Sequence, residues 1–192
     1  MTATNLHGLI LAGGRSTRMG TDKALLAYGA RPQLDVCFEL LGRHCASVFV
    51  STRPGLPRPG FPVIEDTVEN IGPMAGILAA LEHERAAPWL VLACDLPYMD
   101  DATLAFLIAH RNPARMATAF LSRHDGLPEP LCAIYEPGIL PAMKEFIAQG
   151  IHCPRKALIC SDIERLVLPV AEALDNINTP SEFDAVNRAR PD

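Results

Sequence analysis

A glycine-rich segment near the start of the chain carries three cations within nine residues. The segment from Leu11 to Lys23 has the sequence LAGGRSTRMGTDK, with Gly13, Gly14, Arg15, Arg18 and Lys23. Glycines allow backbone N–H groups to approach one anion closely, and arginine and lysine side chains bind phosphate oxygens. The segment lacks both common phosphate-loop patterns, Gly-x-x-x-x-Gly-Lys-Ser/Thr and Gly-x-Gly-x-x-Gly. It therefore predicts a phosphate site of another type, the alternative being an exposed basic loop.

Two carboxylates follow predicted strands. Asp95 follows the apolar run WLVLAC at 89–94, and Asp66 follows the sequence VIE at 63–65. The carboxyl ends of parallel strands face the ligand crevice of an α/β sheet. A hard oxygen ligand such as Asp95 suits an Mg²⁺ ion that bridges nucleotide phosphates. The alternatives are a helix cap or loop residue for Asp95 and a turn-forming role for Asp66.

Two further segments leave binding and structural interpretations open. Gly72-Pro73 begins a predicted helix whose N-terminus could favour an anion, and Gly76 lies one turn inside it. Because glycine weakens a helix, Gly76 predicts close packing or a close approach. Near the end of the chain, the amides of Asn176 and Asn178 would share one face of an extended segment and suit a polar heterocycle, or they would simply form a turn.

The elements that must position these residues alternate between strand and helix. The hydrophobic pattern predicts strands at 6–12, 47–51, 62–64, 89–94, 116–121, 131–135 and 166–170. It predicts helices at 32–45, 73–84, 102–110 and 139–148, and a last helix that begins at Thr179-Pro180. This order favours a mostly parallel sheet with crossover helices.

Composition limits the classes of function. The chain has 192 residues, 49% of them apolar, and a net charge of -5, which suits one globular domain and argues against a broad nucleic-acid or membrane surface. We see no targeting or membrane-spanning segment. The six cysteines lack the spacing of a zinc site or a disulfide framework, and we expect reduced, mostly buried thiols in a cytoplasmic protein. The six histidines lack ligand spacing and are expected at the surface or in packing contacts.

The glycine-rich segment resembles the Leu-x-Gly-Gly-x-x-x-Arg-Met-Gly-x-x-Lys signature of Rossmann-like nucleotidyltransferases. Over about residues 6 to 188 the chain resembles the molybdenum cofactor guanylyltransferase (MobA) family. Besides the signature, the matching segments are Val63-Ile-Glu-Asp66, Gly72-Pro-Met-Ala-Gly76, Cys94-Asp-Leu-Pro97 and Asn176-Ile-Asn-Thr-Pro180. The resemblance implies an α/β fold: a single three-layer Rossmann-like domain over 1–192, with helices on both faces of a mostly parallel sheet. Its nucleotide half would span about 6–115 and its acceptor half about 116–188.

The resemblance also implies a reaction and a site. GMP would be transferred from GTP to molybdopterin, with Mg²⁺ as cofactor and pyrophosphate as the second product. Arg18, Lys23 and Asp95 would be catalytic, Asp95 would also hold the metal, and Asn176 and Asn178 would bind the acceptor. The nucleotide would contact Leu11, Ala12, Gly13, Gly14, Lys23, Asp66 and Asp95. A recipient molybdoenzyme or its chaperone would be a further partner.

The sequence departs from the family in one place and leaves alternatives elsewhere. Where the family has an asparagine-containing stretch that contacts the nucleotide, this chain has Ser51-Thr-Arg-Pro54, so that contact is missing or altered. Arg155 and Lys156 form a second cationic spot that would either reach an acceptor phosphate or face solvent. The alternative functions are transfer of CMP, transfer to a sugar phosphate, and a non-catalytic protein that passes the cofactor on.

Overall fold

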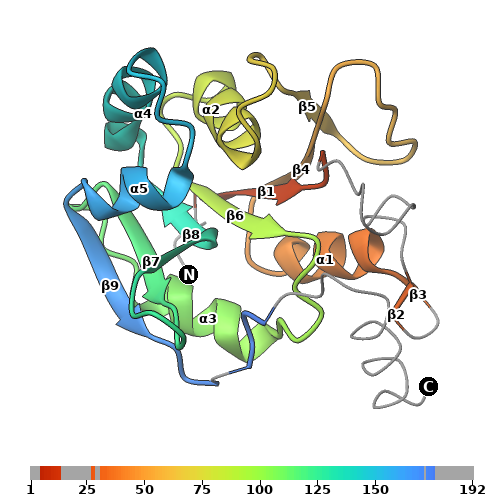
Figure 1. The fold of residues 1–192 in the computed structure, drawn as a ribbon. Coiled ribbons are helices and arrows are strands. Elements are labelled where there is room, and N and C mark those ends of the chain that lie inside the picture. Colours follow the sequence, from red (N-terminus) through yellow and green to blue (C-terminus); the bar gives the residue numbers. More distant parts are fainter. Residues whose placement is uncertain (1–4, 14–26, 29–30, 171, 176–192) are drawn as a thin grey trace.

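A seven-stranded sheet forms the centre of the protein (Figure 1), as seen in a computed structural model that describes residues 5–13, 27–28, 31–170 and 172–175. The strand order is β5-β4-β1-β6-β8-β7-β9. The strands are β1 (His7–Leu11), β4 (Ser47–Thr52), β5 (Val63–Glu65), β6 (Trp89–Ala93), β7 (Ala117–Leu121), β8 (Pro128–Tyr135) and β9 (Ile163–Val167). A separate two-stranded ribbon pairs β2 (Ala27–Tyr28) with β3 (Arg31–Pro32).

All strands of the sheet run in one direction except β8. The pairs β5–β4, β4–β1, β1–β6 and β7–β9 are parallel, whereas β8 is antiparallel to both β6 and β7. The central strands β1 and β6 read as short apolar runs because both of their faces are covered. The predicted α/β class and mostly parallel sheet are confirmed.

Within the described residues, five helices cover the two faces of the sheet (Figure 1). They are α1 (Gln33–Gly42), α2 (Pro73–His83), α3 (Asp101–Ala109), α4 (Leu140–Ala148), which follows a 3-10 turn at Pro137–Ile139, and α5 (Pro154–Ile159). One core cluster joins α1 and α3 to the sheet, and a second cluster joins α2, α4 and α5 to its other face. Successive residues of β1 divide between them, with Leu9 in one cluster and Ile10 in the other, as the alternation of a strand requires. The predicted three layers are therefore present.

Several elements differ from the sequence prediction. The ribbon of β2 and β3 was not predicted, and β8 begins at Pro128 rather than at residue 131. The last strand, predicted at 166–170, is β9 at Ile163–Val167, because Ile163 is the buried residue that packs into the core while Val167 and Val170 are exposed. Helix α5 was not predicted, since its six residues are too few to show a helical period. The helix predicted from Thr179-Pro180 lies outside the described residues. Within the part of the chain that is described, no helix has the length and apolar character needed to cross a membrane.

Candidate functional site

The carboxyl ends of β1, β4 and β6 meet at one edge of the sheet. Leu11 is aligned with Ser51 on one side and with Ala93 on the other. Gly13 and Asp95 each follow these aligned positions by two residues, and the strands stay in contact there, because the Cys94 amide donates to the Leu11 carbonyl at 3.4 Å. The register therefore brings the predicted phosphate segment and the predicted metal ligand to the same edge.

Gly13 packs directly on the backbone that follows β4. A Cβ atom added at Gly13 would lie 3.4 Å from the backbone nitrogen of Arg53. The Ala12 amide donates to the Ser51 carbonyl at 3.2 Å, which extends the strand pairing by one step. The beginning of the glycine-rich segment is thus held flat against β4.

A buried arginine also holds this segment. Arg58, from the proline-rich loop between β4 and β5, donates from Nη2 to the Ala12 carbonyl oxygen at 2.7 Å and is only 7% exposed. Hydrogen bonds to a charged donor are stronger than neutral ones. Sequence reasoning missed Arg58, because a lone arginine among prolines gives no sign that it is buried.

Asp66 is fixed by Ser51, which begins the stretch that departs from the family pattern. Ser51 Oγ donates to Asp66 Oδ1 at 2.9 Å, and the Asp66 amide donates to the Thr52 carbonyl at 2.9 Å. Burial raises the pKa of the Asp66 carboxyl above its ordinary value, while the hydrogen bond from Ser51 and the charge of Arg53 partly oppose this rise. Ser51 therefore positions Asp66 at this edge of the sheet.

Gly76 makes room for that arrangement. A Cβ atom at Gly76 would lie 2.2 Å from Ser51 Oγ and 2.9 Å from Leu11 Cδ2. The close approach anticipated from a glycine inside a helix is confirmed, since α2 packs on the ends of β1 and β4 with no space for a methyl group. Gly72, at the start of α2, has a φ of +62°, a conformation that favours glycine.

Asp95 lies in the turn after β6, half-buried, next to the start of α1. The buried Gln33 donates from Nε2 to the carbonyl of Leu96 at 3.4 Å and to Cys37 Sγ at 3.6 Å. Burial, with a smaller contribution from the charge of Asp95, raises the pKa of the Cys37 thiol to about 12, while the hydrogen bond from Gln33 opposes this rise. Gln33 was not predicted, and its position is decided by the packing of α1.

The structure brings five predicted nucleotide-site residues to this edge: Leu11, Ala12, Gly13, Asp66 and Asp95. The other predicted site residues, Gly14, Arg18, Lys23, Asn176 and Asn178, lie outside the described residues.

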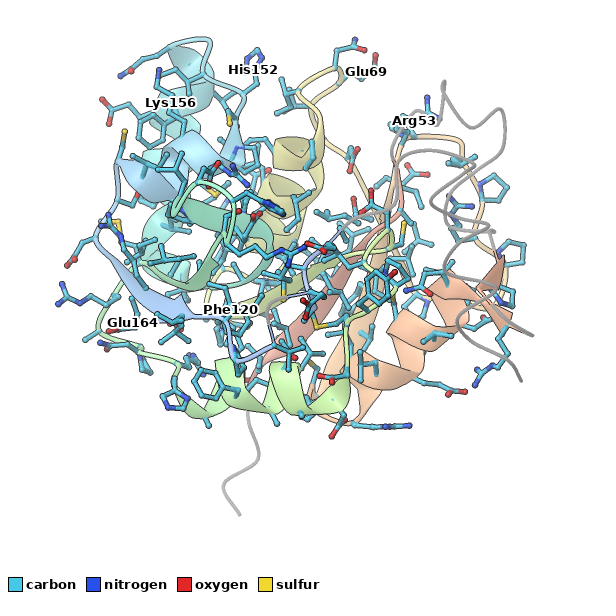
Figure 2. The ribbon with its side chains drawn as sticks, turned by 60° about the horizontal axis from the view of Figure 1, so that its bottom comes forward. Arg53, Glu69, Phe120, His152, Lys156 and Glu164 are labelled. Atoms are coloured by element: carbon cyan, nitrogen blue, oxygen red, sulfur yellow. The ribbon has the colours of Figure 1, made fainter. Side chains whose placement is uncertain are left out.

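Arg155 and Lys156 have different environments. Arg155 donates to Asp125 Oδ2 at 2.9 Å and to Glu129 Oε2 at 2.8 Å, so it joins α5 to the β7–β8 hairpin. Lys156 is exposed and lies on the outer side of the molecule, far from Arg53 at the end of β4 (Figure 2). Lys156 therefore faces solvent, whereas Arg155 forms ion pairs with two carboxylates.

The predicted packing roles of the cysteines and histidines hold in most cases. Cys37, Cys94 and Cys132 are buried and Cys45 is partly buried, as expected for most of the thiols, whereas Cys153 and Cys160 are exposed. No two of the six cysteines, all of which the structure describes, form a disulfide. His7 and His83 pack in an aromatic cluster with Phe49 and the fully buried Trp89, at the opposite edge of the sheet from Asp95.

The side chains at the carboxyl ends of β1, β4 and β6 suit one type of metal ion. Among the described residues no group of three or more histidine, cysteine, aspartate or glutamate side chains could hold an ion by itself. Mg²⁺ is typically held by one or two carboxylates together with water and substrate phosphates. The carboxylate of Asp95 fits such an ion, whereas the described residues offer no ligand set that would enclose a metal by themselves.

Comparison with known proteins identifies relatives of the chain. Residues 8–162 match the family described as the MobA-like NTP transferase domain. A probable molybdenum cofactor guanylyltransferase of Nostoc is 32% identical over 95% of this chain and 90% of its own length. A molybdenum cofactor biosynthesis bifunctional protein of Synechocystis is 37% identical over 97% of this chain, which spans only 55% of that longer protein.

Solved structures share the fold. A molybdopterin-guanine dinucleotide biosynthesis protein A from Archaeoglobus fulgidus superposes with a TM-score of 0.76 at 21% identity, covering 95% of this chain and 97% of the other. A protein of Mycobacterium tuberculosis, solved in complex with manganese, has a TM-score of 0.68 at 17% identity and covers 97% of this chain and 100% of the other. At these identities the likeness concerns the fold.

Proposed function

Since the chain belongs to the MobA-like NTP transferase family, we propose that it transfers GMP from GTP to molybdopterin or its molybdenum-loaded form, releasing pyrophosphate. The observation that carries the proposal is the register of β1, β4 and β6. Leu11, Ser51 and Ala93 are aligned across these strands, and Gly13, Arg53 and Asp95 each follow two residues later, at the carboxyl ends. In an open α/β sheet, ligands bind in the crevice outside such strand ends. The nucleotide half of about 6–115 and the acceptor half of about 116–188 remain our proposed division.

The reaction requires positioning and charge compensation more than a protein base. The terminal phosphate of the acceptor attacks the α-phosphorus of GTP, a new phosphorus–oxygen bond forms, and the bond to pyrophosphate breaks. A phosphate nucleophile is already ionised at neutral pH, so it needs no proton removed. Such transfers depend mainly on orientation and electrostatic stabilisation.

This chain's residues divide those tasks. The backbone of Leu11 to Gly14 would hold the guanine nucleotide, and Asp66, oriented by Ser51, would bind a polar group of it. Arg18 and Lys23 would compensate the charge that builds on the leaving pyrophosphate, and Asn176 and Asn178 would bind the pterin. Arg58 keeps the Ala12 carbonyl in place, which fixes the backbone at the start of the glycine-rich segment.

Asp95 would hold Mg²⁺ together with phosphate oxygens. When bound, the ion supplies positive charge to the phosphates. We keep the cytoplasm as the compartment, as predicted from the cysteines, and a recipient molybdoenzyme or its chaperone as the partner that takes the product.

Product formation tests the proposal. The protein is incubated with Mg²⁺, molybdopterin and labelled GTP or CTP, and both pyrophosphate and dinucleotide are followed. GMP transfer with little CMP transfer is expected. Turnover with CTP alone would overturn the guanine assignment, and no turnover with any nucleotide would overturn the enzymatic function and favour a cofactor-carrying protein.

A matched pair of variants tests Asp95. Asp95→Asn is expected to lower Mg²⁺-dependent kcat about 100-fold or more, because the ligand loses its charge. Asp101→Asn removes the same charge from an exposed carboxylate that pairs with His44 at 3.0 Å, and it should leave kcat unchanged. Equal activity of the two variants would contradict the metal assignment.

A further inference from the structure

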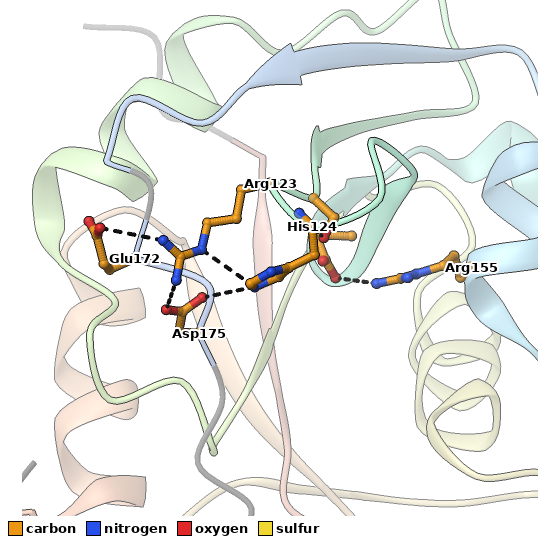
Figure 3. A network of polar contacts seen from close by, with 7 residues as sticks. Arg123, His124, Arg155, Glu172 and Asp175 are labelled. Atoms are coloured by element: carbon orange, nitrogen blue, oxygen red, sulfur yellow. Dashed lines mark hydrogen bonds and ion pairs between the residues drawn. The ribbon is translucent and has the colours of Figure 1, made fainter. Parts of the chain in front are cut away.

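Arg123 links the β7–β8 turn to the chain that follows β9 (Figure 3). Its guanidinium donates from Nη2 to Asp175 Oδ2 at 2.5 Å and from Nη1 to Glu172 Oε1 at 3.4 Å. His124 Nε2 lies 3.4 Å from the other oxygen of Asp175. Two adjacent side chains of one turn thus hold both oxygens of a single carboxylate, which fixes its orientation as well as its position.

The turn that presents Arg123 is itself well anchored. The Gly126 amide donates to the Ser122 carbonyl at 2.9 Å, the Ser122 amide donates to the Leu127 carbonyl at 2.8 Å, and Gly126 has a φ of +68°. On the other side, Asp125 is bound by Arg155 of α5, which also binds Glu129 (Figure 3). A turn closed by its own backbone and tied to a helix can hold a neighbouring segment in place.

This turn lies at the same edge of the sheet as Asp95. In the antiparallel pair of β6 and β8, Leu92 is aligned with Cys132, so the residues of β8 that precede Cys132 extend toward and past the carboxyl end of β6. Strand β7 also ends there, at Leu121, because it is antiparallel to β8. The turn at 122–127 therefore belongs to the edge that carries the candidate nucleotide site.

The segment held by Arg123 leads directly into the predicted acceptor residues. Ala173 is fully buried and its amide donates to the Val170 carbonyl at 3.2 Å, while the Asp175 amide donates to the Glu172 carbonyl at 2.9 Å. Asp175 is bonded to Asn176 in the sequence. The ion pair thus fixes the last described residue before the amides that are proposed to bind the pterin.

Direct binding of the acceptor phosphate by this cluster is disfavoured by its charge. Two guanidiniums face four carboxylates: Arg123 and Arg155 against Asp125, Glu129, Glu172 and Asp175. An added anion would have to displace these ion pairs. The arginines of this face are therefore better suited to holding protein segments than to holding a substrate phosphate.

We propose that Arg123 is a positioning residue for acceptor binding, acting through Asp175 on the segment that begins at Asn176. This inference rests on the proposed function, in which Asn176 and Asn178 contact the pterin. The β7–β8 turn, in the proposed acceptor half of the chain, would thus contribute to acceptor binding. It would not contribute to the proposed nucleotide contacts at Gly13 and Asp66.

Steady-state kinetics with a matched control tests the proposal. Arg123→Gln should raise the KM for molybdopterin about fivefold, the effect of about 1 kcal/mol, with the KM for GTP unchanged. Arg115→Gln removes an exposed arginine that pairs with Asp162 at the start of β9, at the opposite edge of the sheet, and should change neither constant. Asp175→Asn should match Arg123→Gln, and the double variant should be no worse than either, because both remove one interaction. An unchanged acceptor KM, an equal rise of both KM values, or additive effects would overturn the proposal.

Hydrogen exchange provides a readout that does not depend on turnover. In Arg123→Gln the amides of Ala173 and Asp175 should exchange faster than in the wild type, and in Arg115→Gln they should not. If the wild type transfers no GMP, the proposed function fails, while exchange still decides whether Arg123 holds this segment. Unchanged exchange in Arg123→Gln would overturn the positioning role even in an active enzyme.

Discussion

Replacing Gly76 with alanine should destabilise the protein and weaken nucleotide binding, although alanine favours helices. The new Cβ would lie 2.2 Å from Ser51 Oγ and 2.9 Å from both Ser51 Cβ and Leu11 Cδ2. Either α2 must move away from β4, or Ser51 must rotate, which breaks its hydrogen bond to Asp66. Overpacking costs about 1–3 kcal/mol and the lost hydrogen bond about 1 kcal/mol, while the gain in helix propensity is about 1 kcal/mol. The net loss of unfolding free energy is about 2 kcal/mol.

Gly42→Ala is the matched control. Gly42 ends α1, and a Cβ atom built there meets nothing within 4 Å. The same substitution should therefore stabilise the protein by about 0.5 kcal/mol, because only the conformational freedom of glycine is lost. Thermal unfolding followed by circular dichroism should show Tm lower by about 4–8 °C for Gly76→Ala and slightly higher for Gly42→Ala.

A double-mutant cycle separates the clash from the hydrogen bond. Ser51→Ala alone removes the bond to Asp66, and in that background Gly76→Ala should cost less than in the wild type, since the contact with Oγ is gone. The KM for GTP should rise about tenfold in Gly76→Ala if Asp66 binds the nucleotide. Gly76→Ala with wild-type Tm and KM, or strictly additive effects with Ser51→Ala, would refute the reasoning.

Three further predictions follow from buried charges and thiols. In urea unfolding near neutral pH, Asp66→Asn should be more stable than the wild type. The pKa of Asp66 is raised in the folded protein, so its ionised form lowers the free energy of unfolding. The difference in stability between the two proteins should therefore shrink as pH falls through that pKa. A constant difference at all pH values would contradict this. Arg58→Met should lower the unfolding free energy by about 1.5–3 kcal/mol and raise the KM for GTP, because the Ala12 carbonyl loses a charged donor; an unchanged KM would show that the loop is held without it. A thiol reagent at neutral pH should label two cysteines quickly and the other four only on unfolding. Burial raises the pKa of three of those four thiols to about 12. Fast labelling of more than two cysteines would contradict this burial. The fast pair is Cys153 and Cys160, and the slow set is Cys37, Cys45, Cys94 and Cys132.

The α/β class and most of the element order could be predicted from local pattern. Short apolar runs that end in glycine or aspartate mark covered parallel strands, and the runs before Gly13 and Asp95 are of this kind. The short helix α5 and the bounds of β9 could not be predicted, because six residues carry no clear period and because burial of Ile163 depends on its partner β7.

The sequence by itself determined which residues could do chemistry. It marked Gly13, Asp66 and Asp95 by residue type and by their place after strands, and it marked Gly76 as a helical glycine that needs a reason. These inferences rest on spacing along the chain, which is a local property.

Only the tertiary structure decided how those residues are supported. Ser51 orients Asp66, Arg58 holds the Ala12 carbonyl across 46 positions of sequence, and Arg123 reaches Asp175 across 52. It also placed Arg155 between two carboxylates, where spacing alone had left its role open. The physical reason is that ion pairs and buried hydrogen bonds depend on which loops the strand order brings to one edge, and no local pattern encodes that order.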